Sequence, residues 1–226
     1  KKNFFHYITT GMPYVIMKIA MSADGKTASK TGHSKWITNS ISRESSHFTR
    51  KRVSAIMVGI NTVLEDNPML NCRCDNPKHP LRVVCDNNLR IPLECNLVKT
   101  ANEIPTLVAT VSNNIDKIDR LKECGVDIVK TSGDRVNLRE LMSELGNRKI
   151  DSVLVEGGST LHWSILHENL VDGLHLYIAP KIIGGKDAKT AVGGAGLESV
   201  NDAFMFTSPE IELLGDDILI TYKKAR

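Results

Sequence analysis

The chain has 226 residues, of which 41% are hydrophobic and 24% charged, and its formal net charge is +3. This composition is typical of a globular protein, and the length suits one domain or two small ones. The small charge and the 5% aromatic content disfavour a nucleic-acid-binding surface. No apolar stretch approaches the roughly 18 residues of a membrane span, and no segment resembles a signal peptide. We therefore expect a cytoplasmic protein.

Strand and helix patterns alternate along the chain. Strands are predicted at 13–20, 54–60, 81–85, 106–110, 126–130, 152–155 and 173–178, and helices at 40–52, 115–124, 138–145 and 159–168, with one helical turn at 61–65. Beyond Pro180 glycines mark a loop-rich stretch, and 211–214 and 218–222 predict an antiparallel hairpin.

Repeated strand–helix units that end in a hairpin predict an α/β fold with three layers, α/β/α, around a mostly parallel mixed sheet. No internal repeat or long linker divides the chain, so we expect one domain. Ligands of such sheets bind beyond the carboxyl ends of the strands.

Five cysteines are an odd number, and only Cys72 and Cys74 lie close together. No second ligand pair follows them at zinc-site spacing, and His162 and His167 are off the i, i+4 spacing of helix-borne zinc ligands. We expect free thiols in a reducing compartment, no bound metal, and histidines with surface or structural roles.

The segment 153–161 is the most informative in the chain. An apolar run ends at Glu156, and two glycines then lead to Ser159 and Thr160, which open a helical pattern. The free N–H groups and the positive dipole end of a helix start bind anions, phosphate above all, and Gly158 would allow close approach. An ordinary strand–helix turn explains this segment equally well.

Lys18 interrupts the apolar strand pattern that begins at Val15. Because a buried charge without a partner is costly, we expect the strand end to present Lys18 to a polar cleft; a lysine at a sheet edge is the alternative. The dinucleotide motif G-x-G-x-x-G is absent after the first strand, and Gly194-Ala-Gly196 has no strand before it. A nicotinamide cofactor would therefore bind on a different scaffold.

Several short motifs follow one another in a fixed order: K-I-A-M-S-A-D-G-K-T at 18–27, G-H-S-K-W-I-T at 32–38, Arg50, the turn at 59–73, D-N at 86–87, E-G-G at 156–158 and the A-P-K and G-G motifs at 179–185. In these motifs the chain strongly resembles the reductase domain of riboflavin biosynthesis, the carboxy-terminal half of the bifunctional RibD deaminase/reductase. The resemblance covers Pro13 to Tyr222 and implies a dihydrofolate-reductase-like fold over 13–226.

The resemblance implies NADPH-dependent reduction of 5-amino-6-(5-phosphoribosylamino)uracil to 5-amino-6-(5-phospho-D-ribitylamino)uracil, with hydride transfer to ribose C1′. Three alternatives stay open. The enzyme could act on the non-deaminated 2,5-diamino-6-ribosylaminopyrimidinone 5′-phosphate, or reduce a pterin as dihydrofolate reductase does. The chain could also be a non-catalytic nucleotide-binding module.

Residues 1–12 resemble the inter-domain linker of the bifunctional protein. The zinc deaminase half requires H-x-E and P-C-x-x-C, and neither motif occurs here. Because the first residue is Lys rather than Met, we expect a chain excised from a longer protein with an N-terminal deaminase domain; a gene for the reductase alone is the alternative. The resemblance also implies a homodimer or larger oligomer, formed through edge strands late in the chain.

The resemblance assigns individual residues to ligands. The substrate-binding positions are Ser34, Arg50, Leu70, Arg73 and Glu156, and the cofactor-binding positions are Ala20, Trp36, Thr62, Asp66, Asn87, Gly158, Ser159 and Thr160. We expect Lys18 and Glu156 to be catalytic: Lys18 holds the substrate or polarises its ribose oxygens, and Glu156 bonds the substrate or assists proton transfer.

Arg50 and Arg73 are the expected phosphate ligands, because a planar guanidinium suits phosphate better than an ammonium. Leu70 is expected to act through its backbone, and Trp36 to pack beside the nicotinamide or ribose. Asn87 stands where some relatives have serine, and Asn88 and Arg90 nearby keep a 2′-phosphate pocket feasible. Each residue also has a structural alternative: a surface charge for the arginines, a helix cap for Glu156, a turn brace for Asp66 and a core position for Trp36.

Overall fold

Short runs of aliphatic residues form the strands of the protein, whose structure is a computed structural model that describes residues 2–225. The chain divides into two units, one made of residues 1–14 and 47–158 and the other of residues 15–46 and 159–226. Among the described residues, no helix has both the length and the apolar character needed to cross a membrane.

The sheet of the first unit is entirely parallel. Its strands are β2 (Ala55–Gly59), β3 (Leu81–Cys85), β4 (Thr106–Thr110), β5 (Val126–Lys130) and β6 (Ser152–Gly157), and they lie in the order β5-β4-β3-β2-β6. Residues 55–58 are completely buried, as expected for a parallel strand with helices on both faces. Because the strands are parallel, their carboxyl ends lie along one edge of this sheet.

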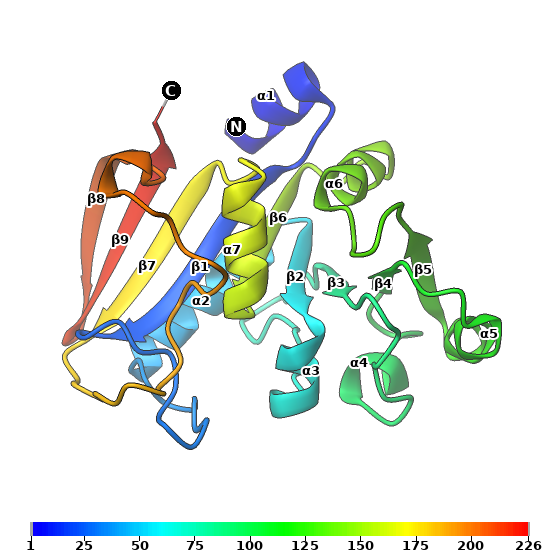
Figure 1. The fold of residues 1–226 in the computed structure, drawn as a ribbon, viewed down its shortest axis with the longest axis horizontal. Helices are drawn as coiled ribbons and strands as arrows, with labels where there is room; N and C mark the ends of the chain where they lie inside the picture. The colour runs from blue at the N-terminus through cyan, green and yellow to red at the C-terminus, as the bar shows by residue number, and fades with distance from the viewer. Residues whose placement is uncertain (1, 226) are drawn as a thin grey trace. The chain divides into compact units, whose positions relative to one another are not determined.

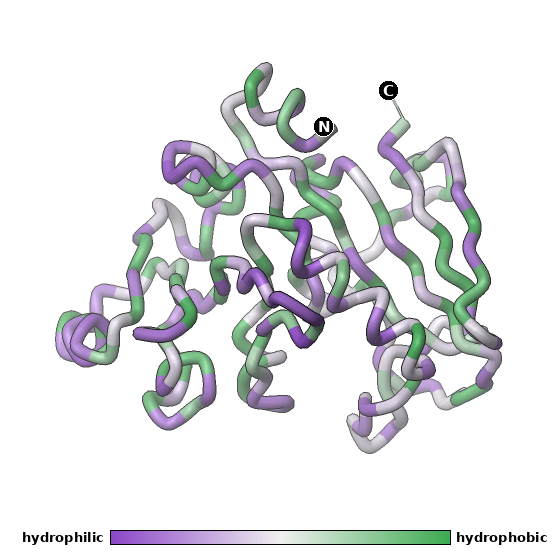
Figure 2. Tube along the Cα trace, turned by 180° about the vertical axis from the view of Figure 1, so that it is seen from behind, coloured by the Kyte–Doolittle hydropathy of each residue, from purple (hydrophilic) through white to green (hydrophobic). Residues whose placement is uncertain are grey.

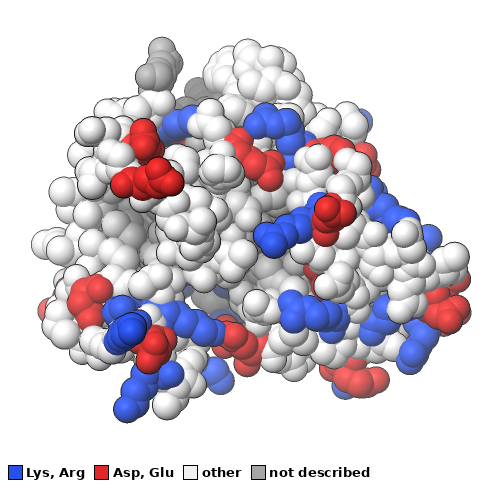
Figure 3. Space-filling view, viewed as in Figure 1, with Lys and Arg blue, Asp and Glu red and all other residues white. Residues whose placement is uncertain are grey.

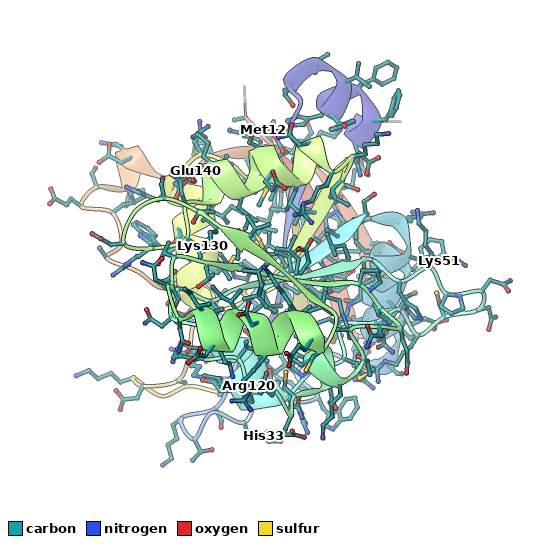
Figure 4. All side chains as sticks on the ribbon, turned by 90° about the vertical axis from the view of Figure 1, so that its right-hand side faces the viewer. Met12, His33, Lys51, Arg120, Lys130 and Glu140 are labelled. Carbon is teal, nitrogen blue, oxygen red and sulfur yellow. The ribbon has the colours of Figure 1, made fainter. Side chains whose placement is uncertain are left out.

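Helices cover both faces of this sheet. The helices α3 (Ile60–Asp66), α4 (Asn96–Lys99) and α5 (Ile115–Glu123) lie on one side, and α6 (Leu138–Asn147) lies on the other (Figures 1 and 4). Apolar residues of α3, α4 and α5, such as Val63, Leu97 and Leu121, pack with Ile56 and Val84 of the strands. The first unit thus has the three layers that the alternating pattern predicts.

The helix α1 (Lys2–Thr10) also belongs to the first unit. The Tyr7 hydroxyl donates to the Gly146 carbonyl oxygen at 3.0 Å. A Cβ atom on Gly146 would lie 2.0 Å from the Gly11 carbonyl oxygen, so only glycine lets α6 approach this segment. Whether residues 1–12 are a linker remnant stays a prediction.

The second unit has a mixed sheet. Its strands β1 (Tyr14–Ser22), β7 (Gly173–Ala179), β9 (Asp217–Lys224) and β8 (Phe206–Leu214) lie in that order. The pair β1–β7 is parallel, whereas β7–β9 and β8–β9 are antiparallel. The unit also contains α7 (Ser159–His167), the short helix η1 (Val200–Asp202) and the first half of α2 (Ser40–Arg52).

The predicted fold class is confirmed: the fold is mixed α/β, with mostly parallel strands and an antiparallel carboxy-terminal hairpin. The helices α1 and α4 were not predicted, and α3 is longer than the single turn expected. Strand β8 begins at Phe206 rather than 211, because Pro209 interrupts the pattern but is tolerated on an edge strand with an irregular register. The prediction of one domain stays open, since the division does not show whether either unit folds alone.

Hydrophobic residues lie along the strands, and hydrophilic residues are prominent in the loops (Figure 2). On the edge strand β8, the hydrophobic side chains of Ile211 and Leu213 are 69% and 74% exposed.

Arg82 of β3 is a charged residue at the centre of the first unit, where its side chain is completely buried. Its guanidinium donates to the carbonyl oxygens of Leu97, Thr100 and Ile104 and to the hydroxyl of Thr106. Burial lowers the pKa of Arg82 to about 10, so the group remains charged at neutral pH. The hydrogen bonds tie β3 to β4 and to the segment that contains α4.

Replacing Arg82 with Met should remove these donors. The Thr100 carbonyl oxygen keeps backbone donors. The single Thr106 hydroxyl proton, however, cannot serve both the Leu97 and the Ile104 carbonyl oxygen, so the free energy of unfolding is expected to fall by about 3–5 kcal/mol. Urea denaturation followed by circular dichroism measures the change. The matched control is Arg120→Met on the outer face of α5 (Figure 4), which should change stability by less than about 0.5 kcal/mol. Equal stability of the two variants would contradict a structural role for Arg82.

Candidate functional site

The residues predicted to bind ligands fall into two groups, one in each unit. The first unit holds Arg50, Thr62, Asp66, Leu70, Arg73, Asn87, Glu156 and Gly158, and the second holds Lys18, Ala20, Ser34, Trp36, Ser159 and Thr160. In the first unit, most of the group follows the carboxyl ends of β2, β3 and β6, as the α/β pattern predicts.

Arg50 and Glu156 form a buried ion pair at the end of β6. Arg50 Nε donates to Glu156 Oε1 at 2.8 Å, and Arg50 Nη2 donates to Glu156 Oε2 at 2.5 Å. The two side chains are 15% and 7% exposed. Burial by itself would lower the pKa of Arg50, but the charge and hydrogen bonds of Glu156 raise it above its usual value. The paired oxygens are characteristic of strong, geometrically fixed arginine–carboxylate contacts.

Arg50 also holds the segment that follows α3, because its Nη1 donates to the Asn71 carbonyl oxygen at 3.0 Å. Three of the five guanidinium N–H groups are therefore used within the described part of the chain, and two remain for a ligand. The contact brings together two residues that are predicted to bind the substrate, and it also makes Glu156 a structural partner of Arg50.

His47 holds Arg73. The Arg73 backbone N lies 3.3 Å from His47 Nδ1, and Arg73 Nε lies 3.1 Å from His47 Nε2. Burial, together with the charges of Arg50 and Arg73, lowers the pKa of His47 to about 4. A neutral imidazole has one acceptor nitrogen, so one of these two contacts is a hydrogen bond at any time.

Sequence reasoning gave His47 no specific role. The available signal was its position three residues before Arg50 on a predicted helix, since residues three apart lie on one helix face. The side chain of Arg73 is largely exposed, so His47 can orient it while leaving other donors for a ligand.

The burial of Leu70 leaves only its backbone to contact a ligand, and its role in binding stays a prediction. Its side chain is 4% exposed and belongs to the core of the first unit. Its φ of +47° is rare for a residue other than glycine, and such strain is often found at functional sites. Asn67, the C-cap of α3, has φ +41°, so the turn between α3 and Arg73 is unusual at two positions.

Thr62 and Asp66 lie four residues apart on α3, and therefore on one face of it. A Cβ atom on Gly157 would lie 3.5 Å from Thr62 Oγ1, which places Thr62 at the end of β6. Asn87 Oδ1 accepts from the Val136 backbone N at 2.9 Å. Within the described residues Asn87 Nδ2 donates no hydrogen bond, and it remains a donor for a ligand.

In the second unit, Lys18 lies inside the sheet and pairs in register with His175 of β7. Its Nζ is 5.3 Å from the centre of the Tyr177 ring. Tyr177 is buried, and its hydroxyl lies 3.1 Å from Ser45 Oγ. Burial and the charge of Lys18 lower the pKa of His175. Lys18 is half-buried, so the alternative of a solvated edge lysine loses support.

Trp36 is 64% exposed, which rules out the alternative of a core tryptophan. Its backbone has φ +66°, and the Arg43 guanidinium lies 4.1 Å from the centre of its ring. Lys181 Nζ donates at 2.7 Å to the carbonyl oxygens of both Trp36 and Ile37. An exposed aromatic ring on a fixed backbone offers a flat surface for a ring-shaped ligand.

Two other predicted ligand-binding residues of the second unit precede Trp36 in the sequence. Ala20 packs beside Tyr177, and Ser34 is half-buried in the loop before Trp36.

Ser159 and Thr160 form the first turn of α7, directly after Gly158 with φ +85°. The late glycine loop packs on this helix: a Cβ atom on Gly193 would lie 3.1 Å from Ser159 Oγ, and one on Gly194 would lie 2.1 Å from Trp163 Cγ. Close packing against α7 therefore explains Gly193 and Gly194.

Within the described residues, no group of three or more His, Cys, Asp or Glu side chains could hold a metal ion. Lysines and arginines are interspersed with acidic residues on the face shown in Figure 3, and no extended basic stripe is visible there. The view gives no support for nucleic-acid binding on this face.

The lowered pKa of His47 predicts a specific dependence of stability on pH. Between pH 6.5 and about 4 the unfolded chain binds a proton at this histidine and the folded chain does not, so the folded state loses stability as the pH falls through this range. His47→Gln should show a smaller drop in Tm between pH 6.5 and 4 than the wild type. The exposed His33 (Figure 4) provides the control, because His33→Gln should keep the wild-type dependence. Identical pH profiles for all three proteins would contradict the burial of neutral His47.

Residues 13–220 match the family model of the RibD C-terminal domain. The chain is 51% identical over 221 residues to the riboflavin biosynthesis protein RibD of Actinobacillus pleuropneumoniae, covering 97% of this chain and 59% of that protein. It is 37% identical over 214 residues to the 2,5-diamino-6-ribosylamino-4(3H)-pyrimidinone 5′-phosphate reductase of Methanothermobacter thermautotrophicus, covering 93% of this chain and 97% of the relative.

Among solved structures, RibD of Acinetobacter baumannii has a TM-score of 0.86 and 29% identity, covering 100% of this chain and 61% of that one. Dihydrofolate reductase of Enterococcus faecalis, with a TM-score of 0.50 and 14% identity over 96% of this chain and 98% of that one, shows the shared fold alone. The chain spans about 60% of the length of the first RibD relatives that it matches. By the match over residues 13–220, this chain belongs to the RibD C-terminal domain family.

Proposed function

We propose that the chain is an NADPH-dependent reductase of riboflavin biosynthesis that converts 5-amino-6-(5-phosphoribosylamino)uracil into 5-amino-6-(5-phospho-D-ribitylamino)uracil. The observation that carries this proposal is the grouping of Arg50, Glu156, His47 and Arg73 in the first unit. Two guanidinium groups, one carboxylate and one neutral imidazole leave an excess of positive charge, which suits a phosphate ester. Similarity to a pyrimidinone phosphate reductase over nearly its whole length supports the reaction type.

In this proposal the phosphate is bound by Arg73 and by the two N–H groups that Arg50 does not use. Glu156 keeps lone pairs that accept hydrogen bonds from the pyrimidine or the ribose. The Arg50 guanidinium favours the ionised form of Glu156. Glu156 is therefore better suited to accept a hydrogen bond from an N–H or O–H group than to supply a proton.

Lys18 is the residue that we assign to the ribose oxygens. Reduction at C1′ requires an open sugar chain, so the ring oxygen must take up a proton when the C1′–O bond breaks. An ammonium group on a rigid strand can donate a hydrogen bond to that oxygen and supply this proton. The contact with the Tyr177 ring restrains the lysine side chain for this role.

Residues of each unit have side chains that suit parts of a nicotinamide dinucleotide. Trp36 offers an exposed ring surface, Ser159 and Thr160 offer hydroxyl groups at a helix start, and Asn87 Nδ2 and the exposed Arg90 offer donors for a 2′-phosphate. We further assign Ala20, Thr62, Asp66 and Gly158 to this cofactor from the family motif. When bound, NADPH supplies the hydride for C1′.

One alternative has specific support. The Methanothermobacter relative is named for the non-deaminated 2,5-diamino pyrimidinone, so that compound is the second candidate substrate. A pterin is a weaker candidate, because the likeness to dihydrofolate reductase is one of fold and because two arginines suit a phosphorylated substrate better.

We also propose that residues 13–226 form one reductase domain that is joined in the full protein to an N-terminal zinc deaminase domain, which the length of the RibD relatives supports. The exposed Ile211 and Leu213 on edge strand β8 support a homodimer or larger oligomer. Sedimentation velocity tests this state, and a monomer at micromolar concentration would contradict it.

Turnover tests the proposed reaction directly. The purified chain should oxidise NADPH faster with the deaminated phosphoribosylaminouracil than with the diamino pyrimidinone. The rate is measured as the loss of NADPH absorbance at 340 nm with about micromolar enzyme. The reverse order of rates would favour the second candidate. A folded protein that binds NADPH, measured by fluorescence, but turns over neither pyrimidine nor dihydrofolate would overturn the assignment as an enzyme.

A further inference from the structure

Two thiols lie side by side in the segment after α3. Cys72 Sγ is 2.9 Å from Cys74 Sγ, although all five cysteines of the protein are free. Within the described residues the other three cysteines make no sulfur–sulfur contact, so this pair is distinct. The residue between the two thiols is Arg73, one of the proposed phosphate ligands.

The two thiols differ in burial and in their neighbours. Cys72 is 2% exposed, its Sγ lies 3.4 Å from the His47 carbonyl oxygen, and its backbone N donates to His79 Nδ1 at 3.2 Å. Burial raises the pKa of the Cys72 thiol. Cys74 is partly exposed and is followed by Asp75, whose carbonyl oxygen accepts from Lys51 Nζ at 2.6 Å (Lys51 is labelled in Figure 4). A dissolved oxidant therefore reaches Cys74 before Cys72.

We propose that Cys72 and Cys74 are a reversible modification site, which a disulfide-class oxidant such as oxidised glutathione converts to an intramolecular disulfide that disturbs Arg73. The expected effect of this disulfide on turnover rests on the proposed function, whereas formation of the disulfide does not. Disulfides inside cells are usually transient and redox-sensing, and a bond between residues two apart is restricted enough to be easily reduced.

The chemistry takes two exchange steps. The Cys74 thiolate attacks one sulfur of oxidised glutathione, forming a mixed disulfide and releasing one glutathione thiolate. Cys72 then loses its proton and attacks Cys74 Sγ, forming the Cys72–Cys74 bond and releasing the second glutathione. Two protein thiols are oxidised and one glutathione disulfide is reduced to two thiols.

We expect closure to shift the backbone on both sides of Arg73, because the two cysteines are only two residues apart. The two sulfur atoms move from 2.9 Å to the disulfide bond length of about 2.05 Å, and the Cβ–S–S–Cβ dihedral takes a value near ±90°. His47 holds Arg73 through one hydrogen bond at a time, at 3.1 or 3.3 Å, and a displacement of Arg73 by about an ångström would break it. Oxidation should therefore weaken binding of the phosphorylated substrate and spare NADPH.

The experiment treats the purified chain with oxidised glutathione, blocks remaining thiols with an alkylating reagent and digests with trypsin without reduction. Trypsin cleaves after Arg73, so the disulfide alone would keep the peptides ending at Arg73 and starting at Cys74 together. We expect these linked peptides, a mass about 2 Da lower than the reduced form, a KM for the pyrimidine about tenfold higher, and full recovery with dithiothreitol. NADPH affinity, measured by fluorescence, should not change.

Matched variants separate the possible outcomes. Cys74→Ser should lose both the linked peptides and the change in KM, whereas Cys124→Ser should keep both. Failure to link Cys72 and Cys74 under conditions that glutathionylate exposed thiols would overturn the site. A disulfide that forms without any change in KM would overturn its coupling to Arg73. A reduced protein without turnover would refute the proposed function but would leave the peptide-linkage result interpretable by itself.

Discussion

The buried ion pair between Arg50 and Glu156 is the interaction on which the candidate site of the first unit depends. Removing either partner would leave a buried charge alone, at a cost of about 3–5 kcal/mol. The pair connects the last turn of α2 to the end of β6, and the third contact of Arg50, to the Asn71 carbonyl oxygen, fixes the start of the segment that carries Arg73. One guanidinium thus sets the geometry of three separate parts of the chain.

His47 adds a second constraint from the same helix face. Its ring is buried and uncharged at neutral pH, so it positions Arg73 without adding a charge. The local charge is then that of two arginines and one glutamate, a balance that favours a doubly charged phosphate over a neutral ligand. The thiols of Cys72 and Cys74 flank the same arginine, which is why their oxidation is expected to reach substrate binding first.

Much of this arrangement could be predicted from sequence, because β2 to β6 are short aliphatic runs bounded by polar residues and turns, and parallel strands place their carboxyl ends together. The helix α1 could not be predicted from sequence, since it depends on a hydrogen bond from Tyr7 to the distant Gly146. The left-handed backbones of Leu70 and Trp36 and the burial of Arg82 are likewise invisible in a pattern of residue types. The family motif predicted that Arg50 and Glu156 bind the substrate, whereas their pairing with each other required the structure.

The most direct test is a double-mutant cycle on Arg50 and Glu156, with the affinity for the phosphoribosylaminouracil measured by calorimetry in the wild type, Arg50→Gln, Glu156→Gln and the double variant. If the pair works as one unit, each single change weakens binding at least about tenfold and the double change adds little more, a coupling of about 1 kcal/mol or above. NADPH affinity stays near the wild-type value in all four proteins. Additive losses, or an equal loss of NADPH affinity, would show that the ion pair does not organise a substrate site.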